Sequence, residues 1–211
     1  MKSLLPAILF MFMSGSLYAQ SASIWKHFLR PDVGSGITFY SLADSDTAAE
    51  NDLDSRRTVF HVGSSVGLNF PFVEIADDFT AGLSPNLGLT FGVASFFSAV
   101  TIDAPIYATL KYKTDATWAG SKSVVGASVG IGYQHTGYFL FDSGSFIDFG
   151  LPVFMAEVNF GKKRSTLGLI KVRYTASIGS HTEIFPADNG GQEGQIVFKH
   201  WGLHLLFTPA Y

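Results

Sequence analysis

The 211-residue sequence contains no cysteine. This absence excludes disulfide bonds, thiolate catalysis and cysteine-ligated metals. Charged residues make up only 15% of the chain and the formal net charge is −3, so no basic surface is expected for a nucleic acid partner. A soluble exported domain normally places more charge on its surface. Residues 79–102 also carry no charge, but their hydrophobicity alternates and includes Pro85 and Asn86, which argues against a membrane-spanning helix.

The first residues have the pattern of a secretory signal peptide. Lys2 precedes an apolar run over residues 4–13, and the segment SGSLYA that follows ends in the small residue Ala19 at a plausible cleavage point. The run is too short to cross a bilayer as a helix. We therefore expect residues 1–19 to be a signal peptide that directs export, with cleavage after Ala19, and the rest of the chain suits one domain.

Aromatic residues make up 15% of the sequence, with 20 Phe, and there are 22 Gly. In the stretch TVFHVGSSVGLNFPF, residues 58–72, large apolar side chains such as Phe60 and Val62 occupy every second position. Between them stand small or polar residues such as His61 and Gly63. Strict alternation of this kind predicts a β-strand with two chemically different faces.

The same alternation recurs along the chain and predicts eight strands. They cover residues 33–42, 58–72, 83–97, 100–112, 125–133, 146–160, 170–178 and 197–211. In 146–160 the apolar phase moves from Phe149 to Phe154, and Pro152 lies where the phase changes. A β-bulge at Pro152 is therefore expected.

The connections between these strands differ in length. Residues 43–57 and 179–194 are long and polar, and 135–145 are of middle length. Shorter turns are expected at 74–81, 114–121 and 161–166, with a tight link near Ser98 and Ala99. Long and short connections thus tend to alternate, as in an up-and-down arrangement of antiparallel strands.

The composition of the two faces indicates what each face meets. The outer face of a water-soluble sandwich should carry Lys, Glu, Asp and Arg. Here one face is mostly Gly, Ser, Thr and Asn, which suits a narrow interior, and the other is rich in Phe, Leu and Val, which suits lipid. Only a closed barrel lets a sheet span a bilayer, because every strand edge must be paired. We expect an all-β, antiparallel up-and-down transmembrane β-barrel over residues 33–211.

This pattern resembles the small eight-stranded outer-membrane barrels of Gram-negative bacteria. The likeness rests on the signal peptide, the alternation, the loop lengths and the closing WGLHLLFTPAY, whose terminal Tyr211 resembles the signal read by the outer-membrane assembly machinery, although Pro209 interrupts its pattern. The resemblance implies that both chain ends face the periplasm and that loops 43–57 and 179–194 face the outside. Residues 20–32 are expected to form either a short interfacial helix around Trp25 or an extension of the first strand.

Several polar residues are expected on the lumen side of the strands: Asp103, Lys111, Asp148, Lys171, Arg173, His200 and His204. Eight strands leave an interior that side chains just fill, so a structural polar plug is favoured over a narrow ion path. Another set is expected toward the outer rim: His61, His135, His181, Asp103, Asp148 and Glu183. No short ligand spacing links these residues, so no catalytic, cofactor-binding or metal site is expected.

The sequence therefore favours a monomeric outer-membrane protein with a structural or interaction role through its extracellular loops. Its expected partners are outer-membrane lipid, the assembly machinery at the C-terminal strand, and an extracellular or envelope protein. Two alternatives stay open. One is a lipid A-modifying barrel enzyme or narrow porin-like channel that uses the lumen and rim His and Asp residues. The other is an exported soluble barrel whose Phe-rich face lines a cavity for a lipid-like ligand.

Overall fold

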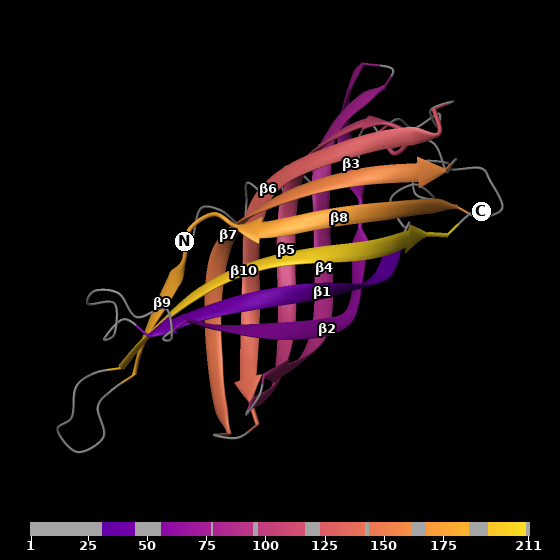
Figure 1. Cartoon of the computed structure of the whole chain (residues 1–211). Helices are drawn as coiled ribbons and strands as arrows, with labels where there is room; N and C mark the ends of the chain where they lie inside the picture. The colour runs from indigo at the N-terminus through magenta and orange to yellow at the C-terminus, as the bar shows by residue number, and fades with distance from the viewer. Residues whose placement is uncertain are drawn as a thin grey trace.

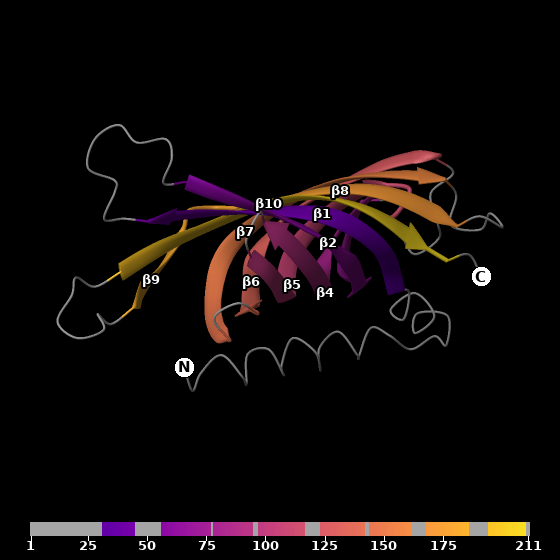
Figure 2. The same ribbon diagram turned by 60° about the horizontal axis from the view of Figure 1, so that its bottom comes forward.

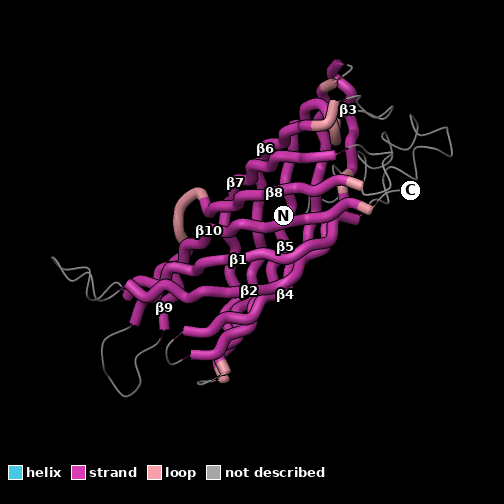
Figure 3. Tube along the Cα trace, turned by 45° about the vertical axis from the view of Figure 1, so that its right-hand side comes forward, coloured by secondary structure: helices cyan, strands magenta, loops and turns pink. Residues whose placement is uncertain are grey.

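The computed structural model describes residues 31–44, 56–76, 78–94, 97–116, 123–141, 144–161, 168–185 and 194–209. All the regular structure in these ranges is β-strand (Figure 3). They contain no helix long and apolar enough to cross a membrane. The expected signal peptide, residues 1–19, lies outside them, as does most of the segment 20–32. The first strand begins at Pro31, so the last two residues of that segment extend it.

Ten strands are present. They are β1 (Pro31–Asp44), β2 (Arg56–Leu68), β3 (Phe70–Ala76), β4 (Phe79–Ala94), β5 (Phe97–Lys113), β6 (Val125–Leu140), β7 (Ser145–Gly161), β8 (Leu169–Ser177), β9 (His181–Phe185) and β10 (Gly194–Thr208).

The strands close into a barrel. β2 and β3 both pair with β4 and so form one interrupted wall strand, and β8 and β9 do the same beside β10. The wall therefore has eight strands, as predicted, and all of its pairings are antiparallel. β1 pairs with β10 from Val33 opposite Phe207 to Asp44 opposite Ile196, which joins the first and last strands (Figure 1). In Figure 2 the β8–β10–β1–β2 side and the β4–β7 side face each other across the interior.

The two ends of the barrel are different. We call the end that holds Pro31 and Pro209 the terminal end. We call the opposite end the loop end; it holds the β1–β2, β4–β5, β6–β7 and β9–β10 connections. The β5–β6 connection at the terminal end runs over residues 114–124 and is as long as the β1–β2 connection, residues 45–55. The expected alternation of long and short connections is therefore only partial.

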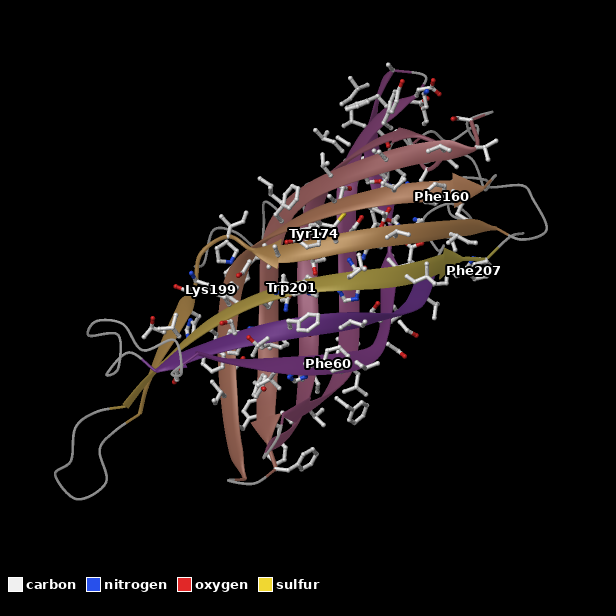
Figure 4. All side chains as sticks on the ribbon, viewed as in Figure 1. Phe60, Phe160, Tyr174, Lys199, Trp201 and Phe207 are labelled. Atoms are coloured by element: carbon white, nitrogen blue, oxygen red, sulfur yellow. The ribbon has the colours of Figure 1, made fainter. Side chains whose placement is uncertain are left out.

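Burial confirms the assignment of the two faces over most of the wall. On β2, Phe60 and Val62 are exposed on the outside, whereas His61 between them is fully buried. Figure 4 shows Phe60, Tyr174 and Trp201 along the outer side of β2, β8 and β10. The alternative in which the Phe-rich face lines an internal cavity is wrong, because that face covers the outside of the barrel.

Strand β7 differs from its prediction. Its pairing with β6 runs from Val125 opposite Phe160 to Leu140 opposite Ser145 without a register shift, so there is no bulge at Pro152. The apolar phase changes because Phe149 and its neighbours on the same face point into the lumen and are buried there. The outward positions of this stretch include Gly150, which the ring of Tyr133 covers.

Irregularities occur elsewhere in the wall. The chain leaves strand geometry at Asn69, between β2 and β3, and the β3–β4 register shifts between Pro71 and Val73 and again between Glu74 and Ala76. The amide of Asn69 bonds Asp32 and Ser84 inside the barrel. We infer that the chain leaves strand geometry at Asn69 because the side chain of this residue points inward to make these hydrogen bonds.

Candidate functional site

The lumen is the first place to look for a function, because alternating side chains from every wall strand meet there. Its contents change from the terminal end to the loop end. A charged cluster comes first, then a network around Asp103, and then a layer of aromatic side chains. Small residues such as Gly63 and Gly130 on the inner face leave room for the larger groups opposite them.

The charged cluster joins three carboxylates to three cations. Lys171 Nζ lies 3.0 Å from Asp32 Oδ2 and 2.8 Å from Asp115 Oδ2. Lys111 Nζ lies 2.8 Å from the same Asp115 oxygen. The Arg173 guanidinium donates to Glu157 from Nε at 2.9 Å and approaches it with a second nitrogen at 2.8 Å. This cluster balances its own formal charge.

Neutral groups complete the cluster. Asp32 also accepts hydrogen bonds from Asn69 at 2.6 Å and from Thr208 at 2.5 Å. Arg173 donates a further bond to the Asn86 side chain at 2.6 Å. Removing charges from water costs several kcal/mol per ion, and only close pairing with filled hydrogen-bond positions offsets that cost. The arrangement is therefore a plug whose members depend on one another.

The middle of the lumen is organised around Asp103. Its carboxylate accepts bonds from Tyr40 at 2.7 Å, Thr136 at 2.7 Å and Gln134 at 2.9 Å. His61 lies beside this network, with Nε2 at 3.2 Å from the Tyr138 hydroxyl. The burial of His61 confirms the expectation that this face of β2 points into the barrel.

An aromatic layer closes the lumen toward the loop end. Phe149 and Phe198 stack with their ring centroids 4.5 Å apart, and His181 stacks on Phe149 at 5.3 Å. Tyr138 meets Tyr40 edge-on at 5.6 Å and lies beside Phe198. Tyr40, Tyr138 and Phe198 are no more than 1% exposed, as in a densely packed core.

A small cavity of about 50 Å³ lies between the charged cluster and the aromatic layer. Asp103, Arg173, His200 and His204 are among its lining residues. Both ring nitrogens of His200 are buried and have no hydrogen-bond partner among the described residues. A polar cavity of this size has room for a few water molecules, which would supply such partners.

The expected rim residues do not form one site. His135 and Asp148 face outward and pair at 2.8 Å, with more than half of each side chain exposed. Asp148 was expected in the lumen, and this was wrong because the phase of β7 turns it outward. His181 pairs with Glu183 at 3.1 Å near the loop end. Within the described ranges, no three His, Asp or Glu side chains are placed to hold a metal ion.

Three lumen carboxylates were missed by sequence reasoning. Asp32 belongs to a segment whose structure the sequence left open, and Asp115 lies in an expected turn. Glu157 is flanked by the apolar residues of β7. The alternation in β7 could have indicated this position. Met155, Glu157 and Asn159 lie on one face, Ala156 and Val158 lie on the other, and a charged residue in the membrane-spanning part of a barrel strand points into the lumen.

Comparison with known proteins gives similarities of fold only. No family model matches the sequence, and no curated protein matches it. The solved outer membrane protein OprG from Pseudomonas aeruginosa is 11% identical, with a TM-score of 0.45, over 86% of this chain and 96% of that one. Neisserial surface protein A is 11% identical, with a TM-score of 0.39, over 82% of this chain and 95% of that one. Ail of Yersinia pestis is 11% identical, with a TM-score of 0.36, over 84% of this chain and 98% of that one. The strand pairing of this chain itself shows the closed eight-stranded barrel.

Proposed function

We propose that this protein is an outer-membrane β-barrel with a sealed lumen, which acts as a rigid support for the segments at its loop end. The observation that carries the proposal is the combination of an apolar outer wall with a lumen filled by paired charges. A bilayer-spanning sheet needs a closed wall, satisfied backbone groups and an apolar outside. The closed strand pairing and the exposed apolar side chains of the described wall fit these requirements.

Aromatic side chains at both ends of the outer wall support the membrane assignment. Phe207 and Phe160 lie near the terminal end, and Trp201 and Phe60 lie toward the loop end (Figure 4). Phe39 stacks on Trp201 with ring centroids 4.1 Å apart. Rows of aromatic side chains at the two membrane–water interfaces are typical of outer-membrane barrels.

The filled lumen argues for a structural or interaction role over transport. The charged cluster and the aromatic layer together obstruct the lumen in two places. Enzymatic use of the lumen has little support, because His61 and Asp103 are each engaged by structural hydrogen bonds and His200 has no carboxylate partner in the part of the chain that the structure describes. Loop-end segments, including residues 45–55 and 186–193, are the expected contact points for an extracellular or envelope partner.

A test of this proposal uses the absence of cysteine from the chain. Single cysteines at Asn51 and Asn189 should react with a membrane-impermeant maleimide on whole cells, and a cysteine at Lys163 should react only after the outer membrane is opened. All three positions lie outside the described residues, so the labelling pattern is independent evidence. Labelling of Lys163 alone on whole cells would invert the orientation and refute the proposed exposure of the loop end.

The cavity beside His200 favours one second candidate function, a narrow ion path that the aromatic layer closes. Single-channel recording in planar bilayers separates the two functions. A sealed support gives no steady conductance, and the Phe198→Ala variant stays closed because the charged cluster still blocks the lumen. Steady conductance of the unaltered protein would favour the ion path.

A further inference from the structure

A groove of about 400 Å³ lies on the outer wall across β4, β5, β6 and β7. The side chains that line it on the outside are apolar: Ala81, Ala108, Leu110, Val129, Ile131 and Phe154. The groove therefore opens toward the space that the proposed function assigns to lipid. It is separate from the lumen cavity, which lies on the other side of the wall.

The groove follows from the sizes of neighbouring outward residues. Ala81 is opposite Leu110 in the β4–β5 pairing, and Ala108 is opposite Leu83. The two alanines thus lie diagonally, each beside a larger residue, and leave a depression between them. Ile131, opposite Ala108 on β6, continues its far side. An unfilled depression loses the dispersion contacts of its lining, so a flexible chain that fills it is favoured.

A cation marks the terminal end of the same wall. Lys113, the last residue of β5, holds its ammonium 5.0 Å from the ring centroid of Tyr112. Tyr112 is an exposed outward residue, so the ammonium lies against the outer surface. At about 3.3 Å of rise per strand residue, Lys113 is roughly 10 Å from Leu110 along β5 and roughly 17 Å from Ala108. A cation and an apolar groove therefore share one strand.

The backbone fixes the position of Lys113. Its φ is 61°, the left-handed region that residues with a side chain seldom occupy. Its N–H donates to the carbonyl of Asp78 at 2.7 Å, and its own carbonyl accepts from the N–H of Ala116 at 2.8 Å. An unfavourable backbone conformation held by two hydrogen bonds is a reason to look for a role at this residue.

We propose that the groove and Lys113 form a binding site for one anionic phospholipid of the leaflet at the terminal end. One acyl chain lies in the groove over Ala81 and Ala108, and the headgroup phosphate is near the Lys113 ammonium. The inference rests on the proposed membrane location of the barrel. It adds that one lipid is held in preference to those that merely surround the wall.

Two separate interactions define the site. Within a bilayer the acyl chain gains no hydrophobic free energy by leaving other chains, so its affinity comes from van der Waals packing against the groove. The headgroup preference comes from attraction between the phosphate and Lys113 at the interface. Asp78 is an exposed residue of the β3–β4 turn whose backbone carbonyl accepts from Lys113, and its negative charge opposes this attraction. Each part can therefore be changed without the other.

Native mass spectrometry of the folded, detergent-purified chain tests the site after incubation with phosphatidylglycerol or phosphatidylcholine. The protein should retain one phosphatidylglycerol in preference to phosphatidylcholine. Lys113→Gln should reduce that preference about five-fold, and Asp78→Asn should increase it. Ala108→Phe fills the groove and should abolish retention of either lipid.

Two matched variants serve as controls. Lys199→Gln removes an exposed cation from the outer wall nearer the loop end, and Ala104→Phe enlarges an outward alanine on β5 outside the groove. Neither should change lipid retention. The inference is overturned if no lipid is retained or if both lipids are retained equally. It is also overturned if Lys199→Gln acts like Lys113→Gln and Ala104→Phe acts like Ala108→Phe. Failure of the chain to insert into vesicles would instead refute the membrane location on which the site depends.

Discussion

The Lys171 ammonium lies 3.0 Å from the Asp32 carboxylate, although 139 positions separate the two residues in the chain. Asp32 is on β1 and Lys171 is on β8, and β10 lies between these strands in the wall. The pair therefore spans the strand that closes the barrel. It connects the charged cluster to the seam where the first and last strands meet.

Replacing Lys171 with Met should destabilise the folded barrel by about 3–5 kcal/mol, because Asp32 and Asp115 are left buried with less positive charge. The midpoint of urea unfolding in detergent micelles measures the change. The double variant Lys171→Met with Asp32→Asn should recover part of the loss. Lys199→Met, at an exposed site, should change stability by no more than about 0.5 kcal/mol. Equal losses at the two lysines would contradict the account of the charged cluster.

Gly34 on β1 sets how closely the closing strands approach. A Cβ at this position would overlap the carbonyl oxygen of Leu205 on β10. Gly34→Ala should therefore cost about 1–3 kcal/mol by forcing the seam apart, and heat-modifiability on gels should show less folded barrel. Gly88→Ala is the matched control, because its added Cβ would come no closer than 3.7 Å to any neighbour. An unaffected Gly34→Ala variant would show that the seam tolerates widening.

Tyr211 lies outside the described residues, and its role in assembly stays a prediction. Deleting Tyr211 or changing it to Asp should sharply lower the membrane-inserted fraction in cells, because the terminal aromatic resembles the assembly signal. His204→Ala, on the inner face of the same strand, should have a much smaller effect. Fractionation with immunoblotting measures both variants, and normal insertion without Tyr211 would remove this assignment.

Local pattern was enough to predict most of the wall. Phe60 and His61 are adjacent in sequence and face opposite sides, as the period-two alternation required. The number of wall strands and the pairing of the first strand with the last also followed, since a sheet in lipid must have no free edge. These features depend on neighbouring residues and on closure alone.

The contents of the lumen could not be predicted in the same way. Phe149 is as apolar as the lipid-facing residues, yet it stacks on Phe198 inside the barrel. Alternation separates the two faces of a strand but does not say which face a run of apolar residues takes. This ambiguity led to the bulge expected at Pro152 and to the wrong side for Asp148. The Asp32–Lys171 pair could not be predicted from local pattern, because the two residues come together only when β1 pairs with β10 and the barrel closes.

The central claim is that the Phe-rich face of the barrel contacts lipid. The chain has three tryptophans, so a variant with Trp25→Phe and Trp118→Phe leaves Trp201 as the only fluorophore. Trp201 is 45% exposed on the outer wall. In vesicles, lipids with brominated acyl chains should strongly quench its emission, and acrylamide in the water should quench it weakly. Strong quenching by acrylamide with no effect of bromine would place this face in water and contradict the account.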